Sequence, residues 1–210
     1  ETSPTDVGFK PDGTKMYVMG SVGDAIHQYS LSTAYDLSTA SSDSVNFSFS
    51  GQDTVPLGFQ FNNDGTKMFM VGNLGDSVYQ YSLSTAYDIS TISYDNVSFS
   101  VTGQETSPTA LTFDANGTKM YVIGAAGDAI HQYSLSTGFD LSTAFYDSVS
   151  FSVSSQDTIP YAVNFNNNGT KMYVIGASGD SVYQYSTTGL ASTTITYPSS
   201  VKWSGATTPD

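Results

Sequence analysis

The tract Gly13-Thr14-Lys15-Met16 decides the fold, because it returns three more times at one fixed spacing. Its glycine stands at Gly13, Gly65, Gly117 and Gly169, so successive copies are 52 residues apart. The 210-residue chain is therefore four copies of one unit and a short remainder. Repeats of about 40 to 50 residues with strand-like content are typical of propellers and other arrays of small sheets. The expected units are 1–52, 53–104, 105–156 and 157–204, and 205–210 is expected to be a tail or linker.

The second unit reads as four short strands joined by turns. Leu57–Phe61 and Lys67–Gly72 flank the turn Asn62-Asn63-Asp64-Gly65, whose residues tolerate positive φ. The second of these strands is a continuous apolar run, which indicates burial on both faces. Ser77–Leu83 is mixed, and Asn96–Thr102 alternates apolar and polar residues as a half-solvated strand does. The strands thus change from buried on both faces near the start of the unit to half-solvated at its end. This order predicts an all-β propeller, with four blades of four antiparallel strands.

Two sets of apolar side chains are expected to fill the contacts between blades of a closed ring. One set comes from the first strands, and its members are Phe9, Phe61, Phe113 and Phe165. The other set covers both faces of the second strands, because adjacent residues on a strand point in opposite directions. Its members are Met16, Met68, Met120 and Met172 together with Tyr17, Phe69, Tyr121 and Tyr173.

The four copies also alternate in pairs. His27 and His131 occupy a column that Tyr79 and Tyr183 fill in the other two copies. In a closed ring this alternation runs without a fault only if the number of blades is even. Four blades from one chain and eight blades from two chains both satisfy that condition, so a homo-oligomer is one expectation. The last unit departs from the pattern at Trp203, as terminal repeats commonly do.

Charge and composition exclude several classes of partner. The chain has 19 acidic residues, six lysines and no arginine, for a net charge of −13. Nucleic-acid binding needs a basic surface that neutralises phosphates, and four of the lysines are a single repeated column. No apolar run has the length of a membrane span, which argues against membrane insertion. There is no cysteine, so neither a disulfide framework nor a thiolate metal site can form.

The stretch from Pro4 to Val18, Pro-Thr-Asp-Val-Gly-Phe-Lys-Pro-Asp-Gly-Thr-Lys-Met-Tyr-Val, resembles the repeat unit of the YVTN/lactonase-like β-propellers. Together with the Gln-Tyr-Ser-Leu-Ser-Thr-Ala-Tyr-Asp-Leu tract that follows, it is similar to repeat proteins of marine bacteria and phage, among them tail and secreted surface proteins. The resemblance implies the propeller fold. It also implies, as one alternative, a lactonase-like hydrolase with a metal ion in the channel, held by Glu, Asn, Asp or His.

The residues themselves favour a non-enzymatic interpretation, and no catalytic residue is assigned. His27 and His131 stand in equivalent positions on different blades, where a packing role shared with tyrosine explains them. Glu1 and Glu105 are the two glutamates, both in loops, and no copy carries a cluster of acids that the others lack. We therefore expect a binding or structural module of an extracellular, virion or cell-surface assembly. A purely architectural, self-assembling repeat is a further alternative.

Acidic residues are the remaining candidates for a binding face. In a propeller, the turns between second and third strands share one face with the links between blades. That face would carry Asp24, Asp76, Asp128 and Asp180 from the turns and Glu1, Asp53, Glu105 and Asp157 from the links. Carboxylates suit calcium, and loops on one face suit a protein or glycan partner. The competing interpretation is that each aspartate caps its own turn through hydrogen bonds to the backbone.

Overall fold

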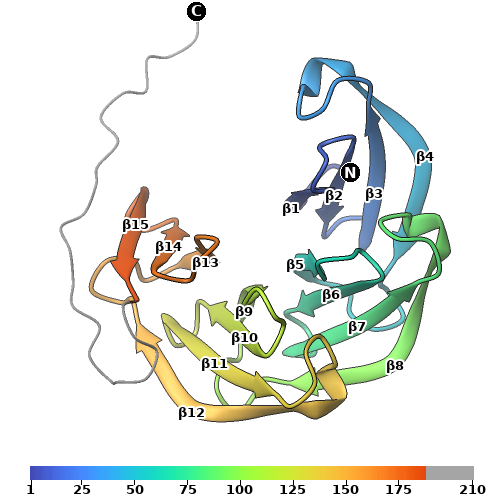
Figure 1. The fold of residues 1–210 in the computed structure, drawn as a ribbon. Helices are drawn as coiled ribbons and strands as arrows, with labels where there is room; N and C mark the ends of the chain where they lie inside the picture. Colours follow the sequence, from blue (N-terminus) through green and yellow to red (C-terminus); the bar gives the residue numbers. More distant parts are fainter. Residues whose placement is uncertain (188–210) are drawn as a thin grey trace, which may run out of the picture.

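The computed structural model describes residues 1–187, which form four small antiparallel sheets arranged as blades of an arc (Figure 1). Blade 1 contains β1 (Pro4–Phe9), β2 (Lys15–Gly20), β3 (Ala25–Leu31) and β4 (Ala40–Ser48). Blade 2 contains β5 (Pro56–Phe61), β6 (Lys67–Gly72), β7 (Ser77–Leu83) and β8 (Ile92–Ser100). Blade 3 contains β9 (Pro108–Phe113), β10 (Lys119–Gly124), β11 (Ala129–Leu135) and β12 (Ala144–Ser152). Blade 4 contains β13 (Pro160–Phe165), β14 (Lys171–Gly176) and β15 (Ser181–Ser186).

Each blade is a meander in which sequential strands pair with one another. The strand order is β1-β2-β3-β4 in the first blade and follows the chain in the same way in the others. The first strand of every blade lies on the inner side of the arc, and the fourth strands β4, β8 and β12 of the first three blades lie on the outer side (Figure 1). The expected all-β propeller is therefore confirmed. The fourth strand expected in the last unit, Trp203 and the expected tail 205–210 lie outside the described residues.

The Gly-Thr-Lys-Met tract forms the turn between the first two strands because its glycine adopts a left-handed conformation. Gly65 has φ +72°, and a Cβ atom built there would lie 2.2 Å from the Tyr87 ring. The preceding residue, Asp64, closes the turn, because its Oδ1 accepts a hydrogen bond from Thr66 N at 2.9 Å. The left-handed backbone favours glycine throughout this column, and the ring contact also requires it at Gly13, Gly65 and Gly117.

The connection between the third and fourth strands is more ordered than the sequence predicted. In blade 2 it contains a 3₁₀ helix, η2 (Ile89–Thr91), at whose start Asp88 Oδ1 accepts from Ser90 N at 3.0 Å. Equivalent helices are η1 (Leu37–Thr39) and η3 (Leu141–Thr143). The fourth strand begins at Ile92 rather than Asn96, and a register shift at Gln80/Tyr81 keeps it paired with β7. Residues 1–187 contain no helix long and apolar enough to cross a bilayer.

Neighbouring blades meet through dry, aromatic interfaces. Between blades 1 and 2, Tyr17 and Ile26 from one sheet pack in a single cluster with Met68 and Tyr81 from the next. Between blades 2 and 3, the equivalent cluster is built around Phe69 and other apolar side chains of both sheets. The methionine and aromatic side chains predicted to fill both faces of the second strands are buried in the interior blades 2 and 3, because both faces of those strands meet a neighbouring sheet.

Residues 1–187 do not form a closed ring, which corrects the expectation of four equivalent buried phenylalanines. Figure 1 shows blade 1 and blade 4 standing apart at the two ends of the arc. Phe113, in an interior blade, is 6% exposed, whereas Phe9 in blade 1 is 36% exposed. Met16 of blade 1 and Tyr173 of blade 4 are only half-buried for the same reason. Each end blade has a neighbour on one side only, so one of its two faces has no sheet to pack against.

Candidate functional site

The acidic side chains of the links between blades are turned into the protein, against the turn of the same blade. Asp53 Oδ2 accepts from Gly75 N at 2.8 Å, and its Oδ1 accepts from Val55 N at 2.8 Å. Glu105 accepts in the same way from Ser107 N at 2.8 Å and Gly127 N at 3.1 Å. Glu1 and Asp157 complete this row. The turns and the links therefore share one face, and these carboxylates connect the two.

These four link carboxylates are buried and already hydrogen-bonded. The carboxyl group of Asp157 illustrates the balance: burial opposes its ionisation, but hydrogen bonds from Ile159 N, Gly179 N and Ser178 hold its pKa below the usual value. A carboxylate stabilised by backbone N–H groups caps the turn, as the competing interpretation of these acids proposed.

The aspartates of the turns themselves occupy left-handed backbone positions. Asp24, Asp76, Asp128 and Asp180 have φ between 44° and 48°. Burial raises the pKa of Asp76, and the negative charges of Asp53 and Glu105 raise it further, so negative charge does gather on this face. Within residues 1–187, however, no group of three His, Cys, Asp or Glu side chains is placed to hold a metal ion. Binding of calcium, a protein or a glycan at this face stays a prediction.

The two histidines lie beside the link glutamates. His27 Nε2 is 4.0 Å from Glu1 Oε2. His131 is buried, and neither of its ring nitrogens has a hydrogen-bond partner. Burial lowers the pKa of His131, although the charge of Glu105 acts in the opposite direction. A neutral, enclosed imidazole without a nucleophile hydrogen-bonded to it fits the packing role inferred from the shared tyrosine column.

Asp6 is a candidate that the sequence argument missed. It lies on β1, the innermost strand of blade 1, and its column is filled by Gly58, Ala110 and Ala162 in the other blades. Asp6 is thus the single acidic residue on the four innermost strands of residues 1–187. In the sequence, Asp6 is visible only as one acidic residue in a column of small residues. The sequence argument considered clusters of acids, which Asp6 does not form.

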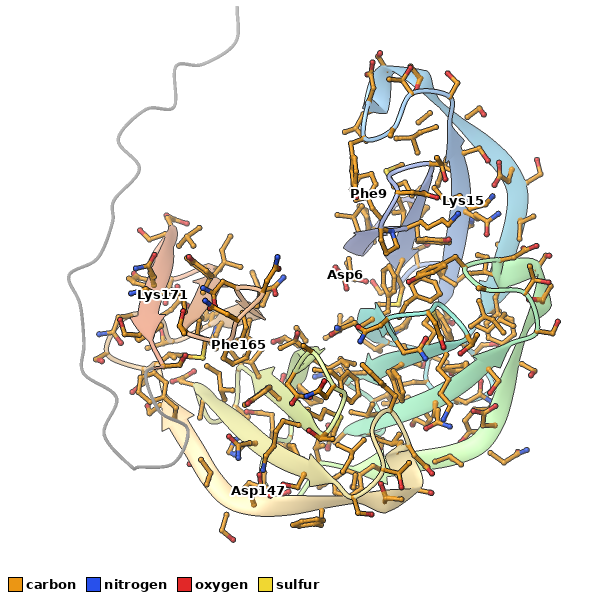
Figure 2. The ribbon with its side chains drawn as sticks, viewed as in Figure 1. Asp6, Phe9, Lys15, Asp147, Phe165 and Lys171 are labelled. Carbon is orange, nitrogen blue, oxygen red and sulfur yellow. The ribbon has the colours of Figure 1, made fainter. Side chains whose placement is uncertain are left out.

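The Asp6 side chain reaches the next blade. It lies at a register shift between β1 and β2 that recurs in the other blades. Asp6 Oδ2 accepts from Phe59 N of blade 2 at 2.9 Å, and Oδ1 accepts from Val7 N at 2.8 Å. Figure 2 shows Asp6 on the inner side of the arc, between the first strands of blades 1 and 2. The carboxyl group therefore bridges two blades at the surface that lines the centre.

The Asp6 carboxyl group has a pKa well above that of an ordinary aspartate. Burial raises its pKa to about 6, although the hydrogen bonds from Phe59 N and Val7 N partly offset this. A carboxyl group with such a pKa is ionised at neutral pH yet is a far stronger base than an ordinary aspartate. Groups perturbed in this way at a concave surface are candidates for acid–base chemistry.

An open pocket of ≈ 280 Å³ lies between the same two blades, on the side of the first turns. Phe59 and Gln60 of β5 and Tyr87 line it, together with Gly8 and Phe9 of β1. Asp6 is not part of this lining.

Comparison with known proteins shows the fold. No protein-family model and no curated protein sequence matches the chain. A protein of Lactobacillus plantarum is similar in structure, with TM-score 0.64 and 15% identity over 93% of this chain and 54% of that chain. A Bacteroides fragilis protein whose name proposes it as a 6-phosphogluconolactonase has TM-score 0.61 and 14% identity, over 87% and 50% of the two chains.

The periplasmic gluconolactonase of Pseudomonas aeruginosa has TM-score 0.55 and 14% identity, over 86% of this chain and 48% of that chain. Identities this low establish the shared fold alone. The structures similar to this chain thus include lactonase-like β-propellers, and the chain spans about half of their length.

These comparisons correct the expectation of a non-enzymatic module. The neighbours that carry an activity in their names include lactonases, which supports the alternative interpretation of a lactonase-like hydrolase instead. The earlier expectation rested on the lack of an acidic cluster in any one copy, and it did not consider a single acid. Asp6 is such an acid: it departs from its column on the innermost strand, and burial raises its pKa to about 6.

Proposed function

We propose that this chain is part of a lactonase-like hydrolase in which Asp6 acts as the general base. The observation that carries the proposal is the position of Asp6, a lone acid on the inner strands with its pKa raised to about 6. Lactonase-like propellers among the structural neighbours give the reaction class.

The reaction follows from what a carboxylate at this position can do. Ionised Asp6 takes a proton from a water molecule while the water oxygen bonds to the carbonyl carbon of the lactone. The tetrahedral adduct then collapses, the ring C–O bond breaks, and the ring oxygen receives the proton from the Asp6 carboxyl group. One lactone and one water give one hydroxy acid, and Asp6 returns to its ionised form. Phe59 N, which donates to Oδ2, holds the carboxyl group in place throughout.

The resemblance to lactonases also implied a metal ion in the channel. The described residues do not fit one, because Asp6 has no second acidic residue or histidine beside it on the inner strands and no group of three ligands occurs in residues 1–187. No step of the proposed reaction passes through a metal.

Charge favours a neutral substrate. The chain carries six lysines and no arginine against 19 acids, so a phosphorylated lactone would meet an unfavourable field. We therefore propose a neutral sugar lactone as the substrate class. Three expectations stay predictions: the finer resemblance to marine bacterial and phage surface proteins, the extracellular or virion location, and a protein or glycan partner.

Hydrolysis of δ-gluconolactone at pH 7.5, followed by acid release in a pH-stat, tests the proposal. We expect a rate above spontaneous opening, which falls by about 10²- to 10⁴-fold in Asp6→Asn. Asp12→Asn is the matched control, because it removes the same charge from the same blade at an exposed turn where Asn168 stands in blade 4. The proposal fails if the wild-type protein gives only the spontaneous rate, or if Asp6→Asn and Asp12→Asn hydrolyse the lactone equally.

A further inference from the structure

The two ends of the arc expose apolar faces that the interior blades bury. On blade 1, Val7 is 56% exposed and Leu37 is 61% exposed. On blade 4, Ile175 is 45% exposed and Val182 is 40% exposed. Each of these side chains lies on the face of its sheet that has no neighbouring blade within residues 1–187. Exposed apolar faces commonly mark an interaction site, so a partner for each is expected.

The repeat itself shows what fits these faces. Blades 1 and 3 are copies of one type, and blades 2 and 4 of the other, so the contact between blades 2 and 3 is the template for placing a blade 1 against a blade 4. In that contact Val71 and Val78 of blade 2 pack in one buried cluster with Leu111 and Leu141 of blade 3. Their counterparts at the free ends are Ile175, Val182, Val7 and Leu37, which are apolar in every case.

Polar groups at the template contact are matched as well. Gln80 Oε1 of blade 2 accepts from Leu141 N of blade 3 at 2.8 Å. The contact between blades 1 and 2 has the equivalent bond, in which Gln28 Oε1 accepts from Ile89 N at 3.1 Å. At the free ends, Gln184 on blade 4 and Leu37 N on blade 1 stand in the same columns.

A second inter-blade hydrogen bond also has its counterparts. Lys67 Nζ donates to Phe139 O at 2.8 Å across the template contact, and Lys171 and Tyr35 occupy these columns at the free ends. Two of the hydrogen-bonding columns depart from the template: Ala177, the counterpart of Asn73, has no side-chain donor, and Asn164 differs from Gln60. Gln60 Oε1 accepts from Phe113 N at 3.0 Å, whereas its counterpart is the shorter Asn164, which accepts from its own neighbour Phe165 N.

We propose that two copies of this chain dock head to tail, with blade 4 of each against blade 1 of the other, and close a ring of eight blades. The occupant is a second copy because the same chain carries both complementary faces, and because the contact continues an interface that its interior already contains. The two blade types also alternate correctly across both junctions. A head-to-tail contact whose rotation closes gives a ring, here with two equivalent junctions. The proposal rests on the repeat and not on the proposed hydrolysis.

Light scattering coupled to size exclusion measures the mass directly. One chain has a mass of 22.3 kDa, and we expect the wild-type protein to have twice this mass. Ile175→Glu places a charge in the junction, so we expect the mass of one chain with retained β-sheet circular dichroism and a cooperative melt. Leu74→Glu is the matched control, because Leu74 is an exposed apolar residue in a turn away from both free faces, and it should keep the double mass.

Cross-linking separates a two-chain ring from closure within one chain. Asn73 Nδ2 donates to Ser107 Oγ at 3.0 Å across the template contact, and the corresponding columns at the free ends hold Ala177 and Ser3. The chain has no native cysteine, so Ser3→Cys with Ala177→Cys can form one designed disulfide at each junction. We expect a two-chain species on denaturing gels, and none from either single variant. A wild-type mass of one chain, an open polymer larger than two chains, or a disulfide within one chain would each overturn the proposal.

Discussion

Replacing Asp6 by asparagine should stabilise the protein at pH 8 and leave its stability almost unchanged at pH 4. Burial raises the pKa of Asp6 from 3.8 to about 6. Because the folded-state pKa is higher than the unfolded one, the folded state binds the proton more tightly. The contribution of this group to stability is therefore fully present below pH 3.8, and it is lost as the pH rises through about 6.

The size of the effect follows from the pKa difference. A shift of about two units corresponds to about 3 kcal/mol of lost stability once Asp6 is ionised. Asparagine does not ionise, but it can accept only one of the two hydrogen bonds that Asp6 accepts from Val7 N and Phe59 N. The missing bond costs about 1 kcal/mol, so the net gain at pH 8 is about 2 kcal/mol. For a domain of this size that gain raises the melting temperature by about 4–8 °C.

Thermal unfolding followed by circular dichroism at pH 4 and pH 8 measures this difference. Asp12→Asn is again the control, because its hydrogen bonds with Lys10 and Thr14 lower the pKa of Asp12, so removing that carboxylate should give no gain at pH 8. A difference between Asp6→Asn and wild type that is equal at the two pH values would refute the argument. So would an Asp6→Asn protein that is less stable than wild type at pH 8.

Three other predictions concern the interfaces and the acidic face. Phe113→Ala should destabilise the protein by about 3–5 kcal/mol in chemical denaturation, because Phe113 is buried between blades 2 and 3 and leaves a cavity; a near-neutral change would contradict that packing. Asp157→Ala should cost about 2–4 kcal/mol at pH 7, because it leaves backbone N–H groups such as Gly179 N without an acceptor. Its pKa is lowered, so this contribution is present above pH 3.8 and is lost as the pH falls through the folded-state value; a cost that is unchanged in acid would count against it. Calcium bound at the acidic face should raise the melting temperature as its concentration increases into the millimolar range; a melt equal to that in chelator would contradict a cation site and would fit Asp53 and Glu105 carboxylates that already accept N–H groups.

The repeat allowed most of the fold to be predicted. Lys67–Gly72 and Ser77–Leu83 were predicted with the bounds that β6 and β7 have, because apolar runs and glycine-rich turns determine them locally. The fourth strand was predicted four residues too late. Its first part pairs with β7 only after a register shift, and that irregularity has no simple signature in the pattern of apolar residues.

The number of blades in the ring could not be predicted from the same information. A 52-residue repeat specifies how one blade packs on the next, and it does so equally for an arc and for a ring. Phe9 and Phe113 stand in the same column, yet one is at a free face and the other in an interface. What distinguishes them is the presence of a neighbour, which is a property of the assembly and not of the column.

The inward orientation of the link acids was also beyond the sequence pattern. Asp53 and Glu105 were placed on the correct face, but their charge suggested exposure to a ligand. The structure shows instead that Gly75 N and Gly127 N point at these carboxylates from the neighbouring turn. Net charge indicates how many acids a surface has to accommodate. Only the backbone geometry shows which of these carboxylates already accept hydrogen bonds from N–H groups.

Asp6 is the position at which packing and the proposed activity make different demands on the chain. Gly58, Ala110 and Ala162 show that a small residue in this column is sufficient to build an inner strand. Asp6 places in the same column a group that costs about 3 kcal/mol when it ionises at neutral pH. A repeat that served packing alone would not need an acid in this column. A destabilising acid on the inner side of the arc, held by a hydrogen bond from the next blade, is what a functional site on a repeating scaffold requires.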